Sequence, residues 1–330
     1  KSLLPTNAII MSQELINNQL VSVWSESMQG GRNENQDYTT AKVLGKTHTV
    51  LVVCDGMGGM AGGRQASFLA AHTIVDSIAE FFYRQDVDEA EKPQPEELLK
   101  EVFQRANLAV FNRGHEDVDL FGMGSTAVVV YLTPEKAYVA HTGDSRCYQL
   151  RNGKKIFRTN DHSRVFELVA AGIYSEEQAR TAPGNNIITR AMGVRKSIEV
   201  EIHQLSYKKG DRFLLCSDGI WNTMPEDQLL NLFNSEENIA DVVKKTTQKV
   251  NEMGINSQQE YDNLTLLCAE THTDSTFQEK TSLAKRFLHW LYKDTKPADT
   301  KKKEEASNKK EKSEALSQQT ASQPTDSQHQ

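Results

Sequence analysis

Two apolar segments of this chain end on the same dipeptide, Asp-Gly, and this ending restricts the possible folds more than any other feature. Residues 50–54 run into Asp55-Gly56, and residues 213–217 run into Asp218-Gly219. A buried strand that stops on Asp places a carboxylate at the rim of a sheet, and the Gly lets the backbone turn and approach a ligand. Because crowded carboxylates repel each other unless a cation lies between them, the two endings predict a divalent-metal site.

The bulk properties of the chain exclude several classes of protein. A formal net charge of −7 over 330 residues argues against nucleic acid as a partner. No apolar run has the roughly 20 residues of a membrane span, and no signal peptide is visible, so we expect a cytoplasmic protein. The four cysteines form no Cys-x-x-Cys pair and are expected to be core residues in a reducing compartment, not a disulfide framework or a zinc site.

Strand-like segments come in clusters joined by short turns, which favours antiparallel sheets flanked by helices over a doubly wound parallel fold. We expect strands at residues 21–27, 38–44, 47–54, 125–132, 137–141, 146–151, 198–205, 212–216 and 264–269. We expect helices at residues 62–84, 95–113, 163–171, 175–181, 225–234 and 239–253. These elements place one domain at residues 12–271.

The C-terminal part differs from the body. Residues 281–292 have the apolar spacing of a short amphipathic helix, which we interpret as docked on the body rather than as a membrane or partner site. Residues 293–330 are rich in Lys, Glu, Ser, Gln and Thr and are predicted to be a disordered polar tail.

Further polar clusters lie at strand ends and in turns. Asp37 begins a strand, Asp144 lies in the turn of residues 142–146, and Asp161 precedes a helix. Asp262 and its neighbour Asn263 precede the last strand. A single Asp in a turn is usually a cap or an Asx-turn residue, but the order and spacing of the whole set favour a common site.

Together these clusters resemble the metal-dependent serine/threonine protein phosphatases of type 2C, in the bacterial form, over residues 31–270. The matching motifs, in family order, are Arg32…Asn35-Gln36-Asp37, Cys54-Asp55-Gly56-Met57-Gly58-Gly59, Gly124-Ser125-Thr126-Ala127, Gly143-Asp144-Ser145-Arg146, Thr159-Asn160-Asp161-His162-Ser163, Thr189-Arg190-Ala191-Met192-Gly193, Cys216-Ser217-Asp218-Gly219 and Asp262-Asn263-Leu264-Thr265. The resemblance implies an α+β fold, a four-layer αββα sandwich of two antiparallel sheets flanked by helices.

The resemblance also implies a mechanism. Two Mn²⁺ or Mg²⁺ ions about 3.5–4 Å apart would activate a shared water that attacks the phosphorus of phosphoserine or phosphothreonine. Asp55 would bridge both ions, and the carbonyl of Gly56 would bind one of them. Asp218 and Asp262 would hold the other ion. Asp144, with Asp218, would form a weaker third site. Gly219, in contrast, is expected only to permit the turn.

Other roles follow from the same resemblance. Arg32 would clamp the substrate phosphate with its two-pronged guanidinium. Asn263 would orient groups beside the metals, and Asp37 would act in the second coordination shell or as a direct ligand. The catalytic set is therefore Arg32, Asp37, Asp55 and Asn263. Thr126 and Asp161 are expected to support the scaffold.

Two positions depart from the common family pattern. Gln36 stands where a Glu is usual, so that position supplies no anionic ligand and metal affinity there should be lower. Met57 stands where eukaryotic relatives often have His, and Met cannot donate a proton to the leaving group. Residues 163–193 correspond to the flap beside the family's active site and are expected to move.

The sequence therefore predicts a protein serine/threonine phosphatase that opposes a serine/threonine kinase, acts on phosphorylated proteins and is a monomer. Two alternatives stay open. One is a catalytically weak module that binds phosphoproteins, suggested by Gln36. The other is a hydrolase of small phosphate esters, which would share the site and differ in the surrounding groove.

Overall fold

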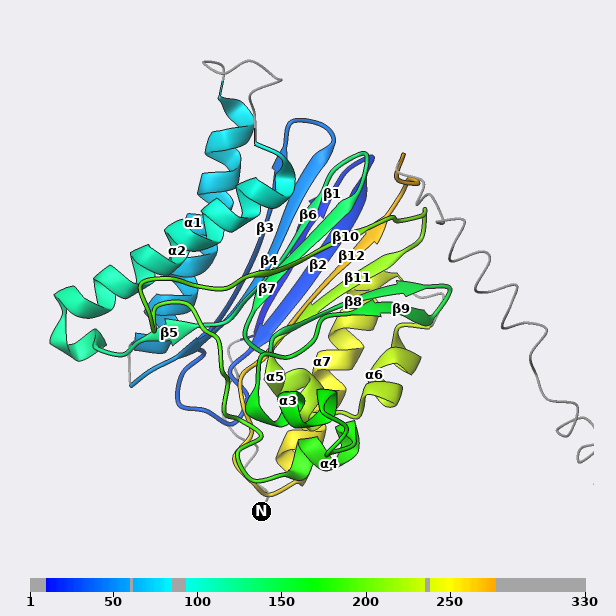
Figure 1. The fold of residues 1–330 in the computed structure, drawn as a ribbon. Helices are drawn as coiled ribbons and strands as arrows, with labels where there is room; N and C mark the ends of the chain where they lie inside the picture. Colours follow the sequence, from blue (N-terminus) through cyan, green and yellow to red (C-terminus); the bar gives the residue numbers. More distant parts are fainter. Residues whose placement is uncertain (1–9, 60–61, 85–92, 235–237, 277–330) are drawn as a thin grey trace, which may run out of the picture. The chain divides into compact units, whose positions relative to one another are not determined.

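Two antiparallel sheets lie face to face at the centre of this computed structural model (Figure 1), which describes residues 10–59, 62–84, 93–234 and 238–276. In the first sheet the strand order is β1 (Ile10–Asn17), β2 (Val21–Met28), β12 (Leu264–Thr271), β11 (Arg212–Cys216), β8 (Arg146–Arg151) and β9 (Lys154–Arg158). In the second it is β10 (Glu201–Leu205), β7 (Ala137–Thr142), β6 (Ala127–Leu132), β4 (His48–Met57) and β3 (Asp37–Leu44), with β5 (Gly124–Ser125) beside β4.

Helices cover the outer face of each sheet (Figure 1). Helices α1 (Gly62–Tyr83) and α2 (Pro95–Glu116) pack on the second sheet, and α5 (Asp218–Thr223), α6 (Glu226–Leu232) and α7 (Ile239–Asn256) lie on the first. Two short helices, α3 (Arg164–Ala170) and α4 (Glu176–Thr181), follow β9, and a single 3₁₀ turn, η2 (Val118–Leu120), follows α2. The predicted α+β fold, a four-layer αββα sandwich, is confirmed.

Strand β4 shows how the pleat directs side chains to the site. Val50, Val52 and Cys54 pack under α1 and α2, whereas Leu51 and Val53 face the other sheet. Because side chains alternate along a strand, Asp55 falls on the side of Leu51 and Val53. The first predicted carboxylate therefore lies at the end of the seam between the two sheets.

Most predicted elements are confirmed within a few residues, and the differences have local reasons. Strand β10 begins at Glu201 instead of residue 198, although Ile198 and Val200 still pack against the core. The sequence did not predict β1, β9 or α5. Strand β9 is short and largely exposed, so its alternation is weak. The turn expected at Asp218-Gly219 is instead the first turn of α5.

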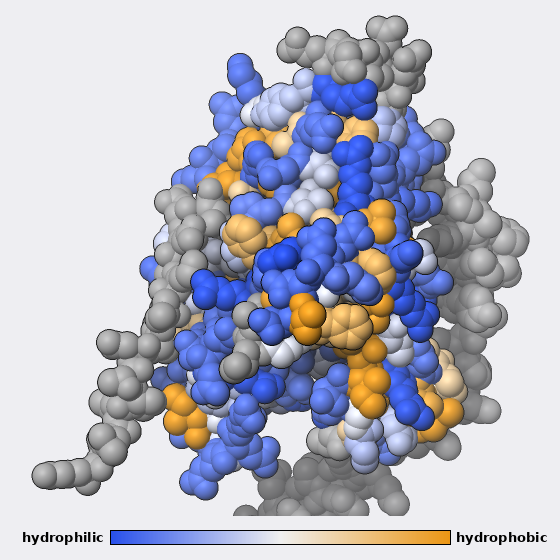
Figure 2. Space-filling view, turned by 90° about the vertical axis from the view of Figure 1, so that its left-hand side faces the viewer, coloured by the Kyte–Doolittle hydropathy of each residue, from blue (hydrophilic) through white to orange (hydrophobic). Residues whose placement is uncertain are grey.

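The residues beyond position 276 lie outside the described part of the chain, which includes the helix predicted at 281–292 and the tail at 293–330. The described residues belong to one compact unit, residues 1–278. Within them, no helix is long and apolar enough to cross a membrane. All four cysteines are free and buried, as predicted. Seen from the side of α1 and α2, the surface is mainly hydrophilic with scattered apolar side chains (Figure 2).

Candidate metal centre

A cavity of about 650 Å³ collects most of the predicted site residues. Four aspartates that are far apart in the sequence, together with Gly56, line its wall. The lining also includes predicted residues with other roles and several that the sequence did not single out. Predicted residues in the lining are Arg32, Gln36, Asp55, Gly56, Met57, Thr126, Asp144, Asp218, Asp262 and Asn263; Asn186 and Ile188 come from the predicted flap, and those not predicted include Glu34 and Glu260.

The end of β4 is fixed by its neighbours. The backbone N–H of Asp55 donates to Thr126 Oγ1 at 3.0 Å, and the N–H of Thr126 donates to the Asp55 carbonyl at 2.8 Å. A Cβ on Gly56 would lie 2.0 Å from the carbonyl oxygen of Gly63, so α1 packs directly against this residue. Thr126 thus supports the scaffold, as predicted, and residue 56 must be Gly because the backbone of α1 leaves no room for a Cβ.

The second Asp-Gly ending has the same steric requirement. Asp218 is the first residue of α5, and a Cβ on Gly219 would lie 2.0 Å from the carbonyl oxygen of Asn263. The expectation that Gly219 only permits a turn was therefore wrong. It lets the backbone of α5 approach the residue that follows Asp262, which brings Asp218 and Asp262 to the same cavity.

The carboxylates of the site crowd one another. Burial, followed by neighbouring carboxylates, raises the pKa of Asp55 and of Asp218 well above the usual value. Burial also raises the pKa of Asp144 to about 7. Asp218 Oδ1 is itself buried and has no hydrogen-bond partner among the described residues. An all-oxygen set with an unpaired buried oxygen fits a hard divalent cation such as Mg²⁺ or Mn²⁺.

Arg32 faces this cluster but is already engaged. Its Nε and Nη2 donate to the two oxygens of Asp262 at 3.1 and 2.9 Å, and its Nη1 donates to Glu260 at 3.2 Å. In this structure the guanidinium that was predicted to bind a phosphate with two donors binds the carboxylate of Asp262 in the same way. The side chain of Arg32 is 45% exposed, so a substrate phosphate could reach it from solvent.

Asn263 organises the loop that carries Arg32. Its Oδ1 accepts the backbone N–H of Gln36 at 2.8 Å, and its Nδ2 donates to the carbonyls of Gln29 and Glu34 at 2.6 and 2.9 Å. Since these bonds join the start of β12 to the loop before β3, Asn263 acts as a positioning residue for that wall of the cavity.

Asp37 lies behind the cavity wall, not in the lining. It is the direct cross-strand partner of Asp55, and its Oδ2 accepts a hydrogen bond from Ser217 Oγ at 2.7 Å. Burial raises the pKa of Asp37 to about 6. This placement suits a group that supports Asp55 from the second coordination shell.

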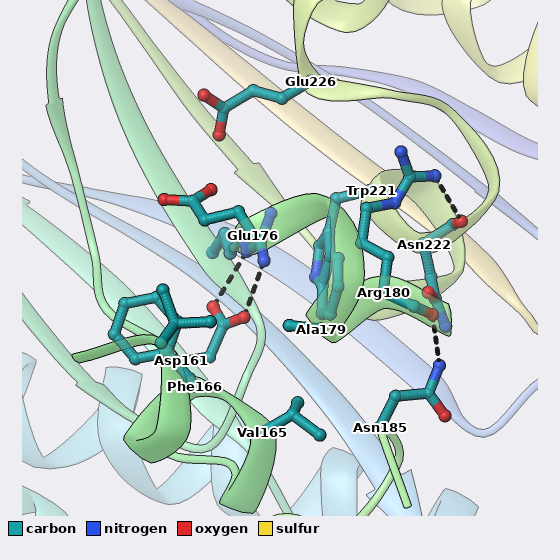
Figure 3. A pocket seen from close by; sticks show the side chains of 12 residues that line it. Asp161, Val165, Phe166, Glu176, Ala179, Arg180, Asn185, Trp221, Asn222 and Glu226 are labelled. Carbon is teal, nitrogen blue, oxygen red and sulfur yellow. Dashed lines mark hydrogen bonds and ion pairs between the residues drawn. The ribbon is translucent and has the colours of Figure 1, made fainter. Parts of the chain in front are cut away.

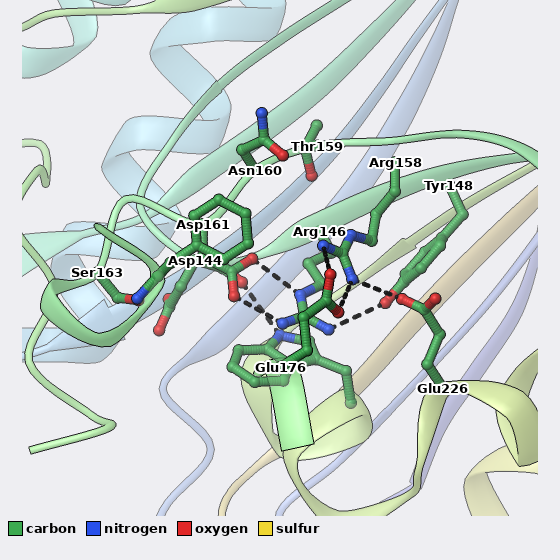
Figure 4. Close-up of polar contacts among 12 residues, drawn as sticks. Asp144, Arg146, Tyr148, Arg158, Thr159, Asn160, Asp161, Ser163, Glu176 and Glu226 are labelled. Atoms are coloured by element: carbon green, nitrogen blue, oxygen red, sulfur yellow. Dashed lines mark hydrogen bonds and ion pairs between the residues drawn. The ribbon is translucent and has the colours of Figure 1, made fainter. Parts of the chain in front are cut away.

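Asp144 is held by a buried polar network (Figure 4). The carbonyl of Asp144 accepts the indole N–H of Trp221 at 3.0 Å, and the Arg146 guanidinium lies 3.6 Å from the centre of that ring. Arg146 also donates to both oxygens of Asp161, at 2.8 and 2.6 Å. Asp161 therefore supports the scaffold, as predicted, by fixing the arginine beneath the Asp144 turn.

The predicted flap, residues 163–193, contributes Asn186 and Ile188 to the large cavity. Helix α4 is tied to the body, because Glu176 pairs with Arg158 at 2.7 Å and Arg180 donates to the carbonyl of Asn222 at 2.9 Å. A small cavity of about 50 Å³ lies under α3 and α4 (Figure 3). It has room for a few waters at most, so the large cavity is the candidate active site.

A second group of possible metal ligands, which the sequence did not reveal, joins His141, His162 and Glu201. His141 and Glu201 are cross-strand partners on β7 and β10. The N–H of Gly143 donates to His162 Nδ1, so neutral His162 carries its proton on Nε2, the atom that faces Glu201. The two imidazole rings are stacked at 8°, and parallel planes cannot both contain one ion. We therefore assign no metal to this group: His162 Nε2 donates to Glu201 at 3.2 Å, and His141 Nε2 donates to the carbonyl of Asn160 at 2.9 Å.

An αββα sandwich with a carboxylate-lined cavity at the seam of its sheets defines the class of metal-dependent serine/threonine protein phosphatases. The chain belongs to the protein phosphatase 2C family, whose family model matches residues 27–258. It is 32% identical over 241 residues to the "Serine/threonine phosphatase stp" of Listeria welshimeri, which covers 73% of this chain and 88% of the relative.

Solved structures agree with this assignment. Serine/threonine phosphatase Stp1 from Staphylococcus aureus matches with a TM-score of 0.67 and 26% identity, covering 78% of this chain and 97% of that chain. The catalytic domain of the phosphatase PstP, solved in complex with 2 manganese ions, matches with a TM-score of 0.61 and 25% identity, covering 77% and 99%. The fold and the family that the sequence predicted are therefore confirmed, and the chain is an enzyme of this phosphatase class.

Proposed function

We propose that this chain hydrolyses phosphoserine and phosphothreonine in proteins at a centre of two Mn²⁺ or Mg²⁺ ions, with a third position beside Asp144. One observation carries the proposal: carboxylates from four separate segments converge on one cavity, and one buried oxygen among them, Asp218 Oδ1, has no partner among the described residues. The manganese reported for the related PstP domain supports the choice of ion.

The residues that would hold the ions follow from their placement. Asp55 would belong to both groups of ligands, with the Gly56 carbonyl in one group and Asp218 and Asp262 in the other; all four residues line the cavity. When bound, the ions would supply a hydroxide nucleophile near neutral pH and neutralise charge on the phosphoryl oxygens. The protein holds the carboxylates in a fixed arrangement through Thr126 and Asn263.

The chain's own residues would bind and orient the substrate. A phosphate that enters the cavity competes with Asp262 for the guanidinium of Arg32, and its bidentate binding would align the phosphorus. Met57 lines the same wall and carries no exchangeable proton. The proton for the leaving alkoxide therefore comes from a group other than residue 57.

Several finer predictions belong to this proposal. The partner is an opposing serine/threonine kinase, the chain is a monomer, and its location is the cytoplasm, where its four free cysteines would stay reduced. The domain boundaries at residues 12 and 271 and the motion of the flap at residues 163–193 also stay predictions.

Phosphate release from a phosphothreonine peptide tests the proposal. The full chain is assayed with Mn²⁺, with and without EDTA, beside Asp55→Asn and a control, Asp76→Asn. Asp76 is an exposed residue of α1 that pairs with Lys42 and does not belong to the cavity lining. We expect EDTA and Asp55→Asn to abolish release, and Asp76→Asn to leave it unchanged.

Phosphate release that is unchanged both by EDTA and by the Asp55→Asn substitution would refute the metal mechanism. No release from the wild-type chain, with phosphopeptide still bound and the fold intact, would favour the binding-module alternative. Release from small phosphate esters but not from phosphopeptides would favour the ester hydrolase.

A further inference from the structure

Glu34 and Gln36 form a pair on one wall of the cavity. The Gln36 side-chain amide donates from Nε2 to Glu34 Oε1 at 2.6 Å, and both residues line the cavity together with Asp55 and Gly56. Glu34 is half-buried. The amide thus fixes the direction of a carboxylate that the sequence pattern did not mark as functional.

The backbone under this pair is held from both ends. Asn263 bonds to the N–H of Gln36 and to the carbonyl of Glu34, as described above. Asn35, between them, accepts the N–H of Asp37 at 3.1 Å and donates to Ser27 Oγ at 2.8 Å. Because the loop is fixed at three successive residues, the position of the Glu34 carboxylate is built into the fold.

The other end of the Gln36 amide, Oε1, packs against Gly63 at the start of α1, next to the carbonyl of Gly56. A Cβ on Gly63 would lie 2.5 Å from Gln36 Oε1 and 2.9 Å from the Gly56 carbonyl oxygen. Two neutral carbonyl oxygens therefore fill the space that a side chain at position 63 would need. Neutral oxygens alone bind a divalent cation weakly, so this side of the cavity needs an anionic oxygen besides Asp55.

Glu34 is the carboxylate available for that role. No Lys or Arg among the described residues pairs with it, whereas Glu260, which lines the same cavity, pairs with Arg32. The ordinary alternative is a surface carboxylate that merely accepts one hydrogen bond. That alternative leaves unexplained why a neutral amide, held by a fixed loop, directs a carboxylate with no cationic partner into a cavity lined by aspartates.

We propose that Glu34 supplies the anionic oxygen for the divalent cation on the Gly56 side of the cavity, with Gln36 as the residue that orients it. The proposal rests on the metal centre proposed above and adds a ligand to it. It also explains how a chain with a neutral residue at position 36 keeps this part of the centre: the charge lies two residues earlier, and the amide connects it to the site.

Calorimetric titration of the metal-free full chain with Mn²⁺ tests the proposal without relying on activity. The variants are Glu34→Gln, the exchanged pair Glu34→Gln/Gln36→Glu, and Glu260→Gln as a control that removes the same charge from the same cavity. We expect Glu34→Gln to weaken the weaker Mn²⁺ binding step about tenfold or more. The control should change it by no more than about twofold, as expected for an exposed charge.

The exchanged pair should recover most of the affinity, because it returns one carboxylate to the same wall. Circular dichroism and melting temperature confirm that each variant is folded. Unchanged Mn²⁺ affinity in folded Glu34→Gln, or a loss no larger than in Glu260→Gln, overturns the proposal. Asp55→Asn distinguishes a failure of this proposal from a failure of the metal centre. If neither Asp55→Asn nor Glu34→Gln changes Mn²⁺ binding, the metal centre itself is wrong. If Asp55→Asn weakens Mn²⁺ binding and Glu34→Gln does not, only the assignment of Glu34 as a ligand fails.

Discussion

Replacing Gly219 by Ala separates two physical effects of opposite sign. Gly219 lies in the first turn of α5, where helix propensity alone predicts that Ala stabilises the protein by about 1 kcal/mol. The structure predicts the reverse, because the new Cβ would lie 2.0 Å from the carbonyl oxygen of Asn263, well under the 3.0 Å that real Cβ contacts respect. One of the two backbone segments must then move by about 1 Å, a distortion of the kind that overpacking imposes.

The expected net effect follows from these magnitudes. Overpacking typically costs about 1–3 kcal/mol and sometimes more, which cancels or exceeds the propensity gain. For a domain of this size each kcal/mol lowers the melting temperature by roughly 2–4 °C. Because Asn263 holds the loop of Gln36 and Glu34, the same shift should also weaken Mn²⁺ binding and phosphate release.

Thermal unfolding, with and without Mn²⁺, provides the assay, and Gly59→Ala is the matched control. Gly59 is exposed and has open space where a Cβ would be. The melting temperature of Gly59→Ala should therefore differ from that of the wild type by no more than about 1–2 °C. A melting temperature of Gly219→Ala at or above that of the wild type, with unchanged Mn²⁺ affinity, would refute the close-approach argument and restore the simple turn interpretation.

The remaining predictions concern the scaffold around the site. Asp161→Asn leaves the buried charge of Arg146 unpaired and should cost about 3–5 kcal/mol in urea unfolding; a cost below about 1 kcal/mol would show that the pair is dispensable. Burial lowers the pKa of His141 to about 4, so between about pH 6.5 and pH 4 only the unfolded chain takes up this proton and stability falls as the pH falls. His141→Gln should therefore lose less stability than the wild type between pH 7 and pH 5, and equal losses would contradict the lowered pKa of His141. Glu176→Gln removes an exposed partner of Arg158 and should cost less than about 1 kcal/mol. It should nevertheless speed proteolytic cleavage within residues 163–193, and an unchanged cleavage rate would argue against the tether.

Much of the fold could be predicted because its signals are short-range. The alternation of apolar residues and the two Asp-Gly endings lie within single strands, so each can be recognised without knowing its neighbours. Elements with weak local patterns escaped prediction, such as the exposed strand β9 and the first turn of α5. The positions of the aspartates at strand ends were correct for the same reason: they depend on where a strand stops.

The composition of the site depended on contacts between distant segments. Arg32 and Asp262 are separated by 230 residues. Their pairing means that the guanidinium expected to bind a substrate phosphate already binds a carboxylate. Asp37, predicted as a ligand or supporting group, lies behind the cavity wall and bonds to Ser217. No local pattern shows either contact, because each depends on how the two sheets pack and which strand ends meet.

The sequence by itself determined the family, the sandwich fold and the identity of the converging aspartates, since these follow from ordered motifs and from strand periodicity. Only the tertiary structure decided that Gly219 is required by the backbone of Asn263, that Asp37 supports the cavity from outside, and that Glu34 joins Gln36 on its wall. The physical reason is the range of the interactions. Periodicity acts over a few residues along the chain, whereas steric exclusion and charge pairing act between any residues that folding brings within a few ångströms.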